Sequence, residues 1–201
     1  VWHGGGTLRR RKRKGQLPET WREWHLRIKI LRGVYVSVRV LFVCLGNICR
    51  SPAAENVMRH LLEADPGVDE GGWTLDSAGT IGFHQGSPPD ARMKSALRRR
   101  GFPCAGAARK IQVADLQTFD LVVVMDRENE RNVLQMAQPD ETGKVRLLTS
   151  FCRRHQREDV PDPYHGGVAG FEQVLDLLED GCGELLRQWK AGEWNQLSPS
   201  G

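Results

Sequence analysis

The segment VLFVCLGNICRSP, residues 40–52, decides the fold of this chain. It begins with an apolar run, and the wider stretch 38–43 is rich in valine, which is typical of a buried strand. Cys44 ends that run. Ser51-Pro52 then indicates the start of a helix, with Ser51 as the expected N-cap and proline in the first turn. The segment therefore predicts a strand, a short loop and a helix in direct succession.

The rest of the chain continues this alternation of strands and helices. Apolar runs and helical periodicity predict strands at 38–43, 73–78, 120–125 and 145–148, and helices at 51–65, 88–100, 127–136 and 171–189. Such alternation implies right-handed βαβ units and a parallel sheet covered by helices on both faces. Ligands bind such sheets beyond the carboxyl ends of the strands, which is where Cys44 lies.

The charge of the chain is divided unevenly. The 201 residues have a net charge of +4, but residues 1–37 alone contain ten Lys and Arg and two Glu. The remaining residues, 38–201, are therefore mildly acidic. A nucleic-acid-binding body would present a basic face, so this composition argues against nucleic acid as the partner of the body.

Residues 1–33 have the composition of an extension outside the folded domain. We expect them to be disordered or partly helical, because a glycine-rich, strongly basic stretch precedes a short amphipathic pattern that contains Trp21 and Trp24. Contact of residues 9–32 with a membrane or polyanion is an alternative, but the compositional signal is weak. We predict the folded domain at 34–192 and a flexible tail at 193–201.

Five cysteines, an odd number, and no recognisable secretory signal favour a reducing compartment, so we expect a cytoplasmic protein. The cysteines and histidines have no zinc-binding spacing, and we therefore expect no structural metal.

The loop after Cys44 has the composition of a phosphate-binding site. Its backbone N–H groups can turn inward as an anion-binding nest, and Gly46 and Asn47 tolerate the positive φ that such a loop needs. The following helix directs its positive N-terminus to the same place. Arg50 adds a bidentate donor that matches a tetrahedral oxyanion. We expect the loop to consist of Leu45, Gly46, Asn47, Ile48, Cys49 and Arg50.

Cys44 lies at the floor of this predicted site. Positive surroundings favour its thiolate, and the Ser51 hydroxyl is placed to donate a hydrogen bond to it. A thiolate beneath a bound phosphate can attack phosphorus in line and form a phosphocysteine, while Arg50 stabilises the transition-state charge. A cysteine after a strand is more often a packing residue, but the joint pattern favours catalysis.

Cleavage of a phosphate ester also needs a general acid, because an expelled alkoxide or phenoxide is costly. The segment DVPDPYHGG, residues 159–167, offers Asp162 between two prolines. The nearby phosphate and thiolate favour its protonated form for the first step, after which it can act as a base on water. Asp159 is a weaker candidate. Without the cysteine loop, Asp-Pro would simply indicate a turn.

Six motifs together resemble the low-molecular-weight protein tyrosine phosphatases. They are VCLGNICRSP at 43–52, DSAGT at 76–80, PPDAR at 88–92, ARK at 108–110, TFDLVVVMD at 118–126 and DPYHGG at 162–167. They follow the family's order along the chain. The resemblance implies a flavodoxin-like, three-layer α/β fold with a four-stranded parallel sheet, no metal or cofactor, and cytosolic hydrolysis of phosphotyrosine.

The resemblance assigns the nucleophile to Cys44, the phosphate-binding arginine to Arg50 and the general acid to Asp162. The loop-bracing residues of the family correspond to Asn47, Ser51 and Ser77. The second cysteine, which in the family can form a reversible disulfide with the nucleophile, corresponds to Cys49, and such a pair can protect against over-oxidation.

The same resemblance places the aromatic walls of the substrate pocket at Phe83 and Tyr164, which can sandwich a phenyl phosphate above Leu45 and Ile48. His84 is a further candidate for contact with the substrate. Relatives that act on phosphoarginine have threonine where this chain has Ile48, so Ile48 favours aryl phosphate.

Two positions depart from the family pattern. Many members have a histidine at the position of Gly106, where it completes a network to the loop serine, so this chain is expected to support its loop less firmly. Many members also have a second aromatic residue after the tyrosine of the DPY motif, where this chain has His165. A solvent-facing loop position is the favoured interpretation of His165.

Two other functions remain as alternatives. A thioredoxin-coupled arsenate reductase uses a similar loop but relays a disulfide to further cysteines, and Cys104, Cys152 and Cys182 are far apart in sequence. The second alternative is a non-catalytic anion-binding module with a basic docking tail. The favoured partner is a phosphotyrosine-containing protein, with tyrosine kinases among the candidates. The sequence does not indicate the oligomeric state.

Overall fold

The computed structural model describes residues 37–68 and 72–193. At its centre is a sheet of four parallel strands in the order β2-β1-β3-β4. The strands are β1 (Val38–Cys44), β2 (Trp73–Gly79), β3 (Leu121–Val124) and β4 (Val145–Leu147). The predicted four-stranded parallel sheet is confirmed.

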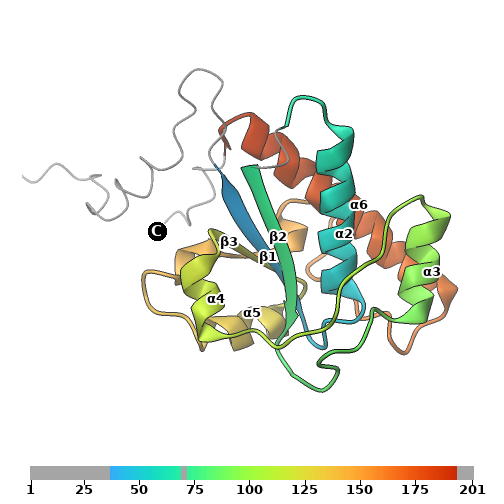
Figure 1. Cartoon of the computed structure of the whole chain (residues 1–201), viewed down its shortest axis with the longest axis horizontal. Helices are drawn as coiled ribbons and strands as arrows, with labels where there is room; N and C mark the ends of the chain where they lie inside the picture. The colour runs from blue at the N-terminus through green and yellow to red at the C-terminus, as the bar shows by residue number, and fades with distance from the viewer. Residues whose placement is uncertain (1–36, 69–71, 194–201) are drawn as a thin grey trace, which may run out of the picture.

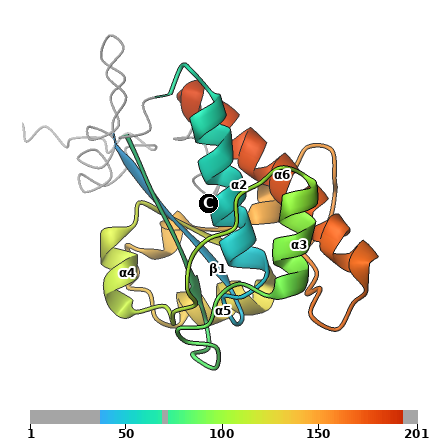
Figure 2. The ribbon, with the colours of Figure 1, turned by 45° about the vertical axis from the view of Figure 1, so that its right-hand side comes forward.

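Helices cover both faces of this sheet. Figures 1 and 2 show α2, α3 and α6 on one side of the sheet and α4 and α5 on the other, so the predicted three-layer architecture is also confirmed. The helices are α2 (Arg50–Ala64), α3 (Ala91–Arg99), α4 (Val113–Thr118), α5 (Arg127–Leu134) and α6 (Val168–Lys190), with 3₁₀ turns η2 (Thr142–Lys144) and η3 (Leu148–Ser150).

Alternation along β1 divides the apolar core between the two faces. Val40 and Phe42 belong to the core cluster beneath α2, α3 and α6, whereas Leu41 and Val43 belong to the cluster beneath α4 and α5. All four side chains are fully buried. Successive residues of a strand point to opposite faces, which explains this division. Cys44 continues the first set, and it is therefore delivered at the carboxyl end of β1 on the side of α2.

One helix and several boundaries differ from the sequence-based expectations. The sequence did not indicate α4, because six residues hold too little periodicity. Its N-terminus is closed by Gln112 and Asp115, and Leu116 is its one buried residue. The prediction of Ser51 as an N-cap is wrong, since α2 begins at Arg50 and the Ser51 hydroxyl turns inward.

Two other helices differ in length from the prediction: α3 is shorter and α6 is longer. The helix predicted from residue 88 begins at Ala91, because the carboxylate of Asp90 accepts a hydrogen bond from the Arg92 N–H and caps the helix. The helix α6 begins at Val168, ahead of its buried stripe, and Cys182 lies fully buried on that stripe as expected.

The predicted N-terminal extension, residues 1–33, and most of the tail, 193–201, lie outside the described residues. Among the helices of the described part, none is both long and apolar enough to cross a membrane.

Candidate active site

The loop between β1 and α2 lies at the carboxyl end of the sheet and is held from outside through its carbonyl groups. The backbone N–H groups of Thr80 and Ile81 donate to the carbonyls of Cys44 and Leu45, at 2.9 and 3.0 Å. The N–H of Asp90 donates to the carbonyl of Ile48 at 2.8 Å. With these carbonyls engaged by neighbouring segments, the loop is placed to turn its own N–H groups toward its interior, as an anion site requires.

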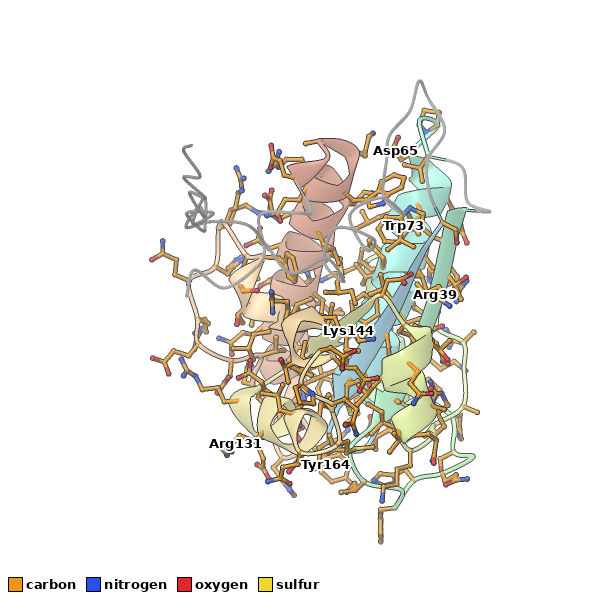
Figure 3. All side chains as sticks on the ribbon, turned by 90° about the vertical axis from the view of Figure 1, so that its left-hand side faces the viewer. Arg39, Asp65, Trp73, Arg131, Lys144 and Tyr164 are labelled. Carbon is orange, nitrogen blue, oxygen red and sulfur yellow. The ribbon has the colours of Figure 1, made fainter. Side chains whose placement is uncertain are left out.

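Figure 3 shows at which end of the molecule the site lies. Tyr164, which lines the site, lies at the opposite end of the fold from Trp73 at the start of β2. The site therefore lies where a parallel sheet offers a binding crevice.

Two glycines allow close contacts around the loop. A Cβ on Gly79 would lie 2.7 Å from the carbonyl oxygen of Leu45, so β2 ends directly against the loop backbone. A Cβ on Gly46 would lie 3.0 Å from the ring of His84. Of the two residues expected to tolerate a positive φ, Asn47 has one, at 55°, and Gly46 does not. Gly46 instead makes room for a histidine ring at the pocket.

Two donors approach the sulfur of Cys44. The Ser51 hydroxyl lies 3.0 Å from Sγ, and the backbone N–H of Asn47 lies 3.3 Å from it. Ser51 is fully buried, and Cys44 is 3% exposed. Hydrogen bonds to a sulfur favour its anionic form.

A buried amide organises the loop from behind. The Asn47 side chain donates through Nδ2 to the hydroxyls of Ser51 and Ser77, each at 3.0 Å, and accepts through Oδ1 from the Arg109 N–H at 2.8 Å. The Ser77 hydroxyl donates to Oε2 of Glu55 at 2.8 Å. The three predicted loop-bracing residues therefore form one connected network.

Arg50 points its guanidinium group under the pocket, with 4% of its side chain exposed. Nη1 donates to Asp126 Oδ2 at 2.6 Å and to the carbonyl of Val160 at 3.0 Å, and Nη2 donates to Asp162 Oδ2 at 3.2 Å. Burial alone would lower the pKa of Arg50, but the negative charges of Cys44, Asp162 and Asp126 raise it. Asp126, the N-cap residue of α5, thus fixes the orientation of the predicted phosphate-binding group.

Asp162 lies on the loop before α6, where 43% of its side chain is exposed. Its Oδ1 accepts a hydrogen bond from the Tyr164 N–H at 3.0 Å, so the loop turns around this carboxylate. The competing candidate, Asp159, instead accepts from the Arg127 N–H at the start of α5, and it does not line the pocket.

Arg92 connects the Asp162 loop to α3. Its Nη1 donates to the carbonyl of Tyr164 at 2.9 Å, and its guanidinium lies over the rings of Tyr164 and Phe171, 5.2 and 4.9 Å from their centres. Asp90 holds the same guanidinium through two further hydrogen bonds and raises the pKa of Arg92. Since Asp90 also donates its N–H to Ile48, this pair links the two loops of the site.

A pocket of about 240 Å³ opens above the cysteine. Its mouth is formed by rings from two loops: the Phe83 and His84 centroids lie 4.9 Å apart, Tyr164 and His165 lie 5.1 Å apart, and His84 and Tyr164 lie 6.5 Å apart. The lining consists of Cys44, Leu45, Gly46, Ile48, Cys49, Arg50, Ile81, Phe83, His84, Asp162, Tyr164 and His165. His165 is exposed, as expected, yet it also lines the pocket.

The family model for low molecular weight phosphotyrosine protein phosphatases matches residues 39–194. The chain belongs to this family. The human low molecular weight phosphotyrosine protein phosphatase is 43% identical over 151 residues, which cover 74% of this chain and 94% of the relative. YfkJ, a low molecular weight protein-tyrosine-phosphatase of Bacillus subtilis, is 43% identical over 150 residues, with the same coverage.

Solved structures agree with these relatives. A protein tyrosine phosphatase from Entamoeba histolytica matches with a TM-score of 0.75 and 37% identity, over 78% of this chain and 99% of that one. With the family comes its enzyme class, the protein tyrosine phosphatases, which are hydrolases.

The cysteines of this phosphatase differ in their surroundings. All five are free thiols. Burial, followed by the charges of Asp90 and Cys44, raises the pKa of Cys49 to about 12, so Cys49 remains a protonated thiol at neutral pH. Within residues 37–68 and 72–193, no group of three or more His, Cys, Asp or Glu side chains is arranged to hold a metal ion.

The residues missed by sequence reasoning are Asp126, Arg92, Glu55 and Ile81. Asp126 had a usable signal, because a carboxylate directly after a buried strand lies at the ligand-binding end of a parallel sheet. Arg92 lies in the PPDAR motif, but no local pattern indicated its bond to the Tyr164 carbonyl, and none indicated the bond between Glu55 and Ser77.

Proposed function

We propose that this phosphatase hydrolyses phosphotyrosine in proteins through a phosphocysteine intermediate on Cys44. The observation that carries the proposal is the meeting of three groups at one pocket: the Cys44 thiol, the Arg50 guanidinium and the Asp162 carboxyl group. Arg50 and Asp162 are 112 positions apart in sequence yet only 3.2 Å apart at Nη2 and Oδ2. Family membership supports the same conclusion.

In the proposed first step, the phosphate of the substrate occupies the loop and takes hydrogen bonds from the loop N–H groups and Arg50. The Cys44 thiolate attacks phosphorus opposite the tyrosyl oxygen, a new S–P bond forms, and the P–O bond to the leaving group breaks. Asp162 donates its proton to the departing phenolate oxygen. Ser51 and the Asn47 N–H favour the thiolate before attack.

In the second step, water attacks the phosphocysteine, and the S–P bond breaks to return the thiolate of Cys44. Asp162, now ionised, accepts a proton from that water, so inorganic phosphate leaves and the starting protonation state is restored. Arg50 stabilises the equatorial oxygens in both steps, and Asp126 keeps its fork directed at the loop.

The pocket favours an aryl phosphate on a protein. Phe83 is 83% exposed and Tyr164 is 41% exposed, so both rings are free to contact a phenyl group, while Ile48 offers an apolar surface below. His84, packed against Gly46, is proposed to contact the substrate beside Phe83. Phosphotyrosine-containing proteins, tyrosine kinases among them, fit this chemistry. We further propose a cytoplasmic enzyme with its catalytic domain at 34–192, near the matched range 39–194.

Cys49 is proposed to protect the nucleophile from over-oxidation. It shares the loop with Cys44, and the two sulfur atoms are close enough for the charge of one to raise the pKa of the other. Oxidation of Cys44 by peroxide to a sulfenic acid, followed by attack of the Cys49 sulfur and release of water, would give a disulfide that a thiol reductant can reverse.

Hydrolysis of aryl phosphates by wild type, Cys44→Ser and Asp162→Ala tests the mechanism. We expect Cys44→Ser to abolish turnover. Asp162→Ala should lower kcat by about 100-fold or more for poor leaving groups, and much less for good ones, because only poor leaving groups need the proton. Activity that survives the Cys44 change would refute the phosphocysteine, and an equal loss across leaving groups would remove Asp162 from the acid role.

Tests with a panel of substrates distinguish this proposed function from its alternatives. Phosphotyrosine, phosphoserine and phosphoarginine peptides should be tested beside arsenate with a thioredoxin system. Reduction of arsenate without ester hydrolysis would favour the reductase, and phosphate binding without either reaction would favour a non-catalytic module. One of the cysteines that such a relay could use, Cys182, is fully buried against α2, with Sγ 3.8 Å from the carbonyl of Ala54, which disfavours its part in a relay.

A further inference from the structure

The carboxylate of Glu55 lies at the outer end of the hydrogen-bond chain that reaches Cys44. Glu55 is on the second turn of α2, with 15% of its side chain exposed. Its Oε1 pairs with Arg59 one turn later at 2.9 Å, and its Oε2 accepts from the hydroxyl of Ser77 at 2.8 Å. An ordinary surface ion pair on a helix would account for Oε1 alone. The hydrogen bond that Oε2 accepts from Ser77 on β2 requires another explanation.

The directions of the hydrogen bonds follow from counting donors. A serine hydroxyl has one hydrogen, and an ionised carboxylate only accepts. Ser77 therefore gives its hydrogen to Glu55, and its oxygen is left to accept from Nδ2 of Asn47, 3.0 Å away. The amide of Asn47 has its NH₂ group toward the two serines, which the acceptor oxygen of Ser77 favours, and the donor Arg109 N–H, 2.8 Å from Oδ1, supports the same orientation.

The same counting applies to Ser51. Its oxygen accepts the second hydrogen of Asn47 Nδ2 at 3.0 Å, so its own hydrogen is available for Sγ of Cys44 at the same distance. The backbone carbonyl of Ala78, at 3.2 Å, is a competing acceptor for this hydrogen. If the Asn47 amide were reversed, both serines would donate to its oxygen, and the bond from Ser51 to Cys44 would be lost.

Gly106 supplies no side chain to this hydrogen-bond network. The sequence comparison led us to expect weaker loop support here, because many relatives have a histidine at this position. In the structure Gly106 has a φ of 114°, and a Cβ on it would meet no atom of the described residues within 4 Å. The Ser77 hydroxyl nevertheless has an ionised partner, Glu55, in direct contact.

We propose that Glu55 is a positioning residue for the nucleophile, acting through Ser77, Asn47 and Ser51 to hold the Ser51 hydrogen on the Cys44 sulfur. The proposal rests on the proposed function, since it concerns the state of the nucleophile in that mechanism. It assigns to Glu55 no contact with substrate or with the reacting atoms. Its effect is to favour the thiolate of Cys44 and to fix the orientation of the loop amide.

The decisive experiment measures the rate of alkylation of Cys44 by iodoacetamide against pH, followed by mass spectrometry of the Cys44 peptide. Glu55→Ala should move the pH midpoint of alkylation upward by about 0.5 to 1 unit, the size expected for loss of one hydrogen bond to an anion. Glu55→Gln, which keeps the shape of the side chain, should move it in the same direction by less. Glu63→Gln removes the same charge from an exposed position of α2 and should leave the midpoint unchanged.

The pH profile of kcat/KM for an aryl phosphate provides the second readout. Glu55→Ala should lower kcat/KM about three- to tenfold below the alkylation midpoint and little above it, because above that pH the thiolate forms without help. General damage to the fold would lower activity at every pH. Arg59→Ala should behave as wild type, since Oε2 keeps its bond to Ser77.

An unchanged alkylation midpoint in Glu55→Ala would overturn the proposal. If that variant does not fold, as judged by its circular dichroism, an unchanged midpoint in Glu55→Gln has the same force. The alkylation assay needs no turnover. A wild-type protein that alkylates with the expected midpoint but hydrolyses no aryl phosphate would therefore contradict the proposed function and leave the assignment of Glu55 standing.

Discussion

The floor and the rim of the pocket are built in opposite ways. The floor consists of Cys44 and Arg50, which line the pocket, and of Asn47 and Ser51 behind them, each at most 3% exposed. Hydrogen bonds connect these residues to Ser77 on β2, to Asp126 at the start of α5 and, through Ser77, to Glu55 on α2. The rim consists of Ile81, Phe83, His84, Tyr164 and His165, and its side chains meet mainly through ring contacts. Buried polar groups need partners, whereas exposed rings are free to accommodate a ligand.

This difference separates two tasks. A network in which each polar atom has a fixed partner can hold an anion site in one geometry before substrate arrives, which lowers the reorganisation needed in the transition state. A rim of exposed rings offers apolar area to a substrate and adapts to its shape. Changes in the floor should therefore alter the chemical step, and changes in the rim should alter substrate binding.

The largest effect is expected at the anchor of the floor. Asp126→Asn removes the charged partner of Arg50 Nη1, so we expect kcat/KM for an aryl phosphate to fall about tenfold to 100-fold as the fork loses its orientation. Asp120→Asn is the matched control, because Asp120 pairs with Arg39 at the other end of β3. Steady-state kinetics should show the loss only for Asp126→Asn. Equal losses in the two variants would mean that the pair only stabilises the fold.

A smaller effect is expected at the junction between floor and rim. Arg92→Ala should lower kcat about tenfold for poor leaving groups, since the loop that bears Asp162 loses its hydrogen bond and its ring contact to α3. Arg99→Ala is the control, because Arg99 lies on the same helix with the same 48% exposure and pairs with Glu172 instead. A loss in kcat that is independent of the leaving group would place Arg92 outside the acid step.

The smallest effect is expected at the rim. Phe83→Ala should raise KM for phosphotyrosine about three- to fivefold with little change in kcat, because one exposed ring contact with the substrate is removed. Val113→Ala trims an exposed apolar side chain on α4 and should change neither constant. A fall in kcat without a change in KM for Phe83→Ala would show that the rim takes part in the chemical step.

Sequence reasoning was most successful where local pattern determines structure. The valine-rich run of β1, the DLVVVM run of β3 and the apolar stripe of α6 identified the sheet and its main helix, and the spacing from Cys44 to Arg50 identified the loop. The strand predicted at 120–125 is observed at Leu121–Val124, one residue shorter at each end, although the N–H groups of Asp120 and Met125 still donate to the carbonyls of Arg39 and Val43.

What the sequence did not indicate depends on contacts between distant segments. The hydroxyl of Ser51 was expected both to cap a helix and to donate to Cys44; the bond to the sulfur is confirmed, whereas the contact with the Asn47 amide, and not a helix cap, is its other interaction there. Glu55 and Ser77 are 22 positions apart, and Arg92 and Tyr164 are 72 positions apart. Only the packing of α2 against β2, and of α3 beside α6, brings these pairs together, and no local pattern encodes such distances.

Gly79 has a consequence for how far this loop can vary. The end of β2 approaches the Leu45 carbonyl so closely that even a methyl group would come within 2.7 Å of it, and two more backbone atoms lie at 3.0 Å. Backbone atoms cannot rotate aside as a long side chain can, so the loop itself would have to move. The curvature of the anion site thus depends partly on the absence of a side chain at Gly79, a residue of the neighbouring strand that does not line the pocket.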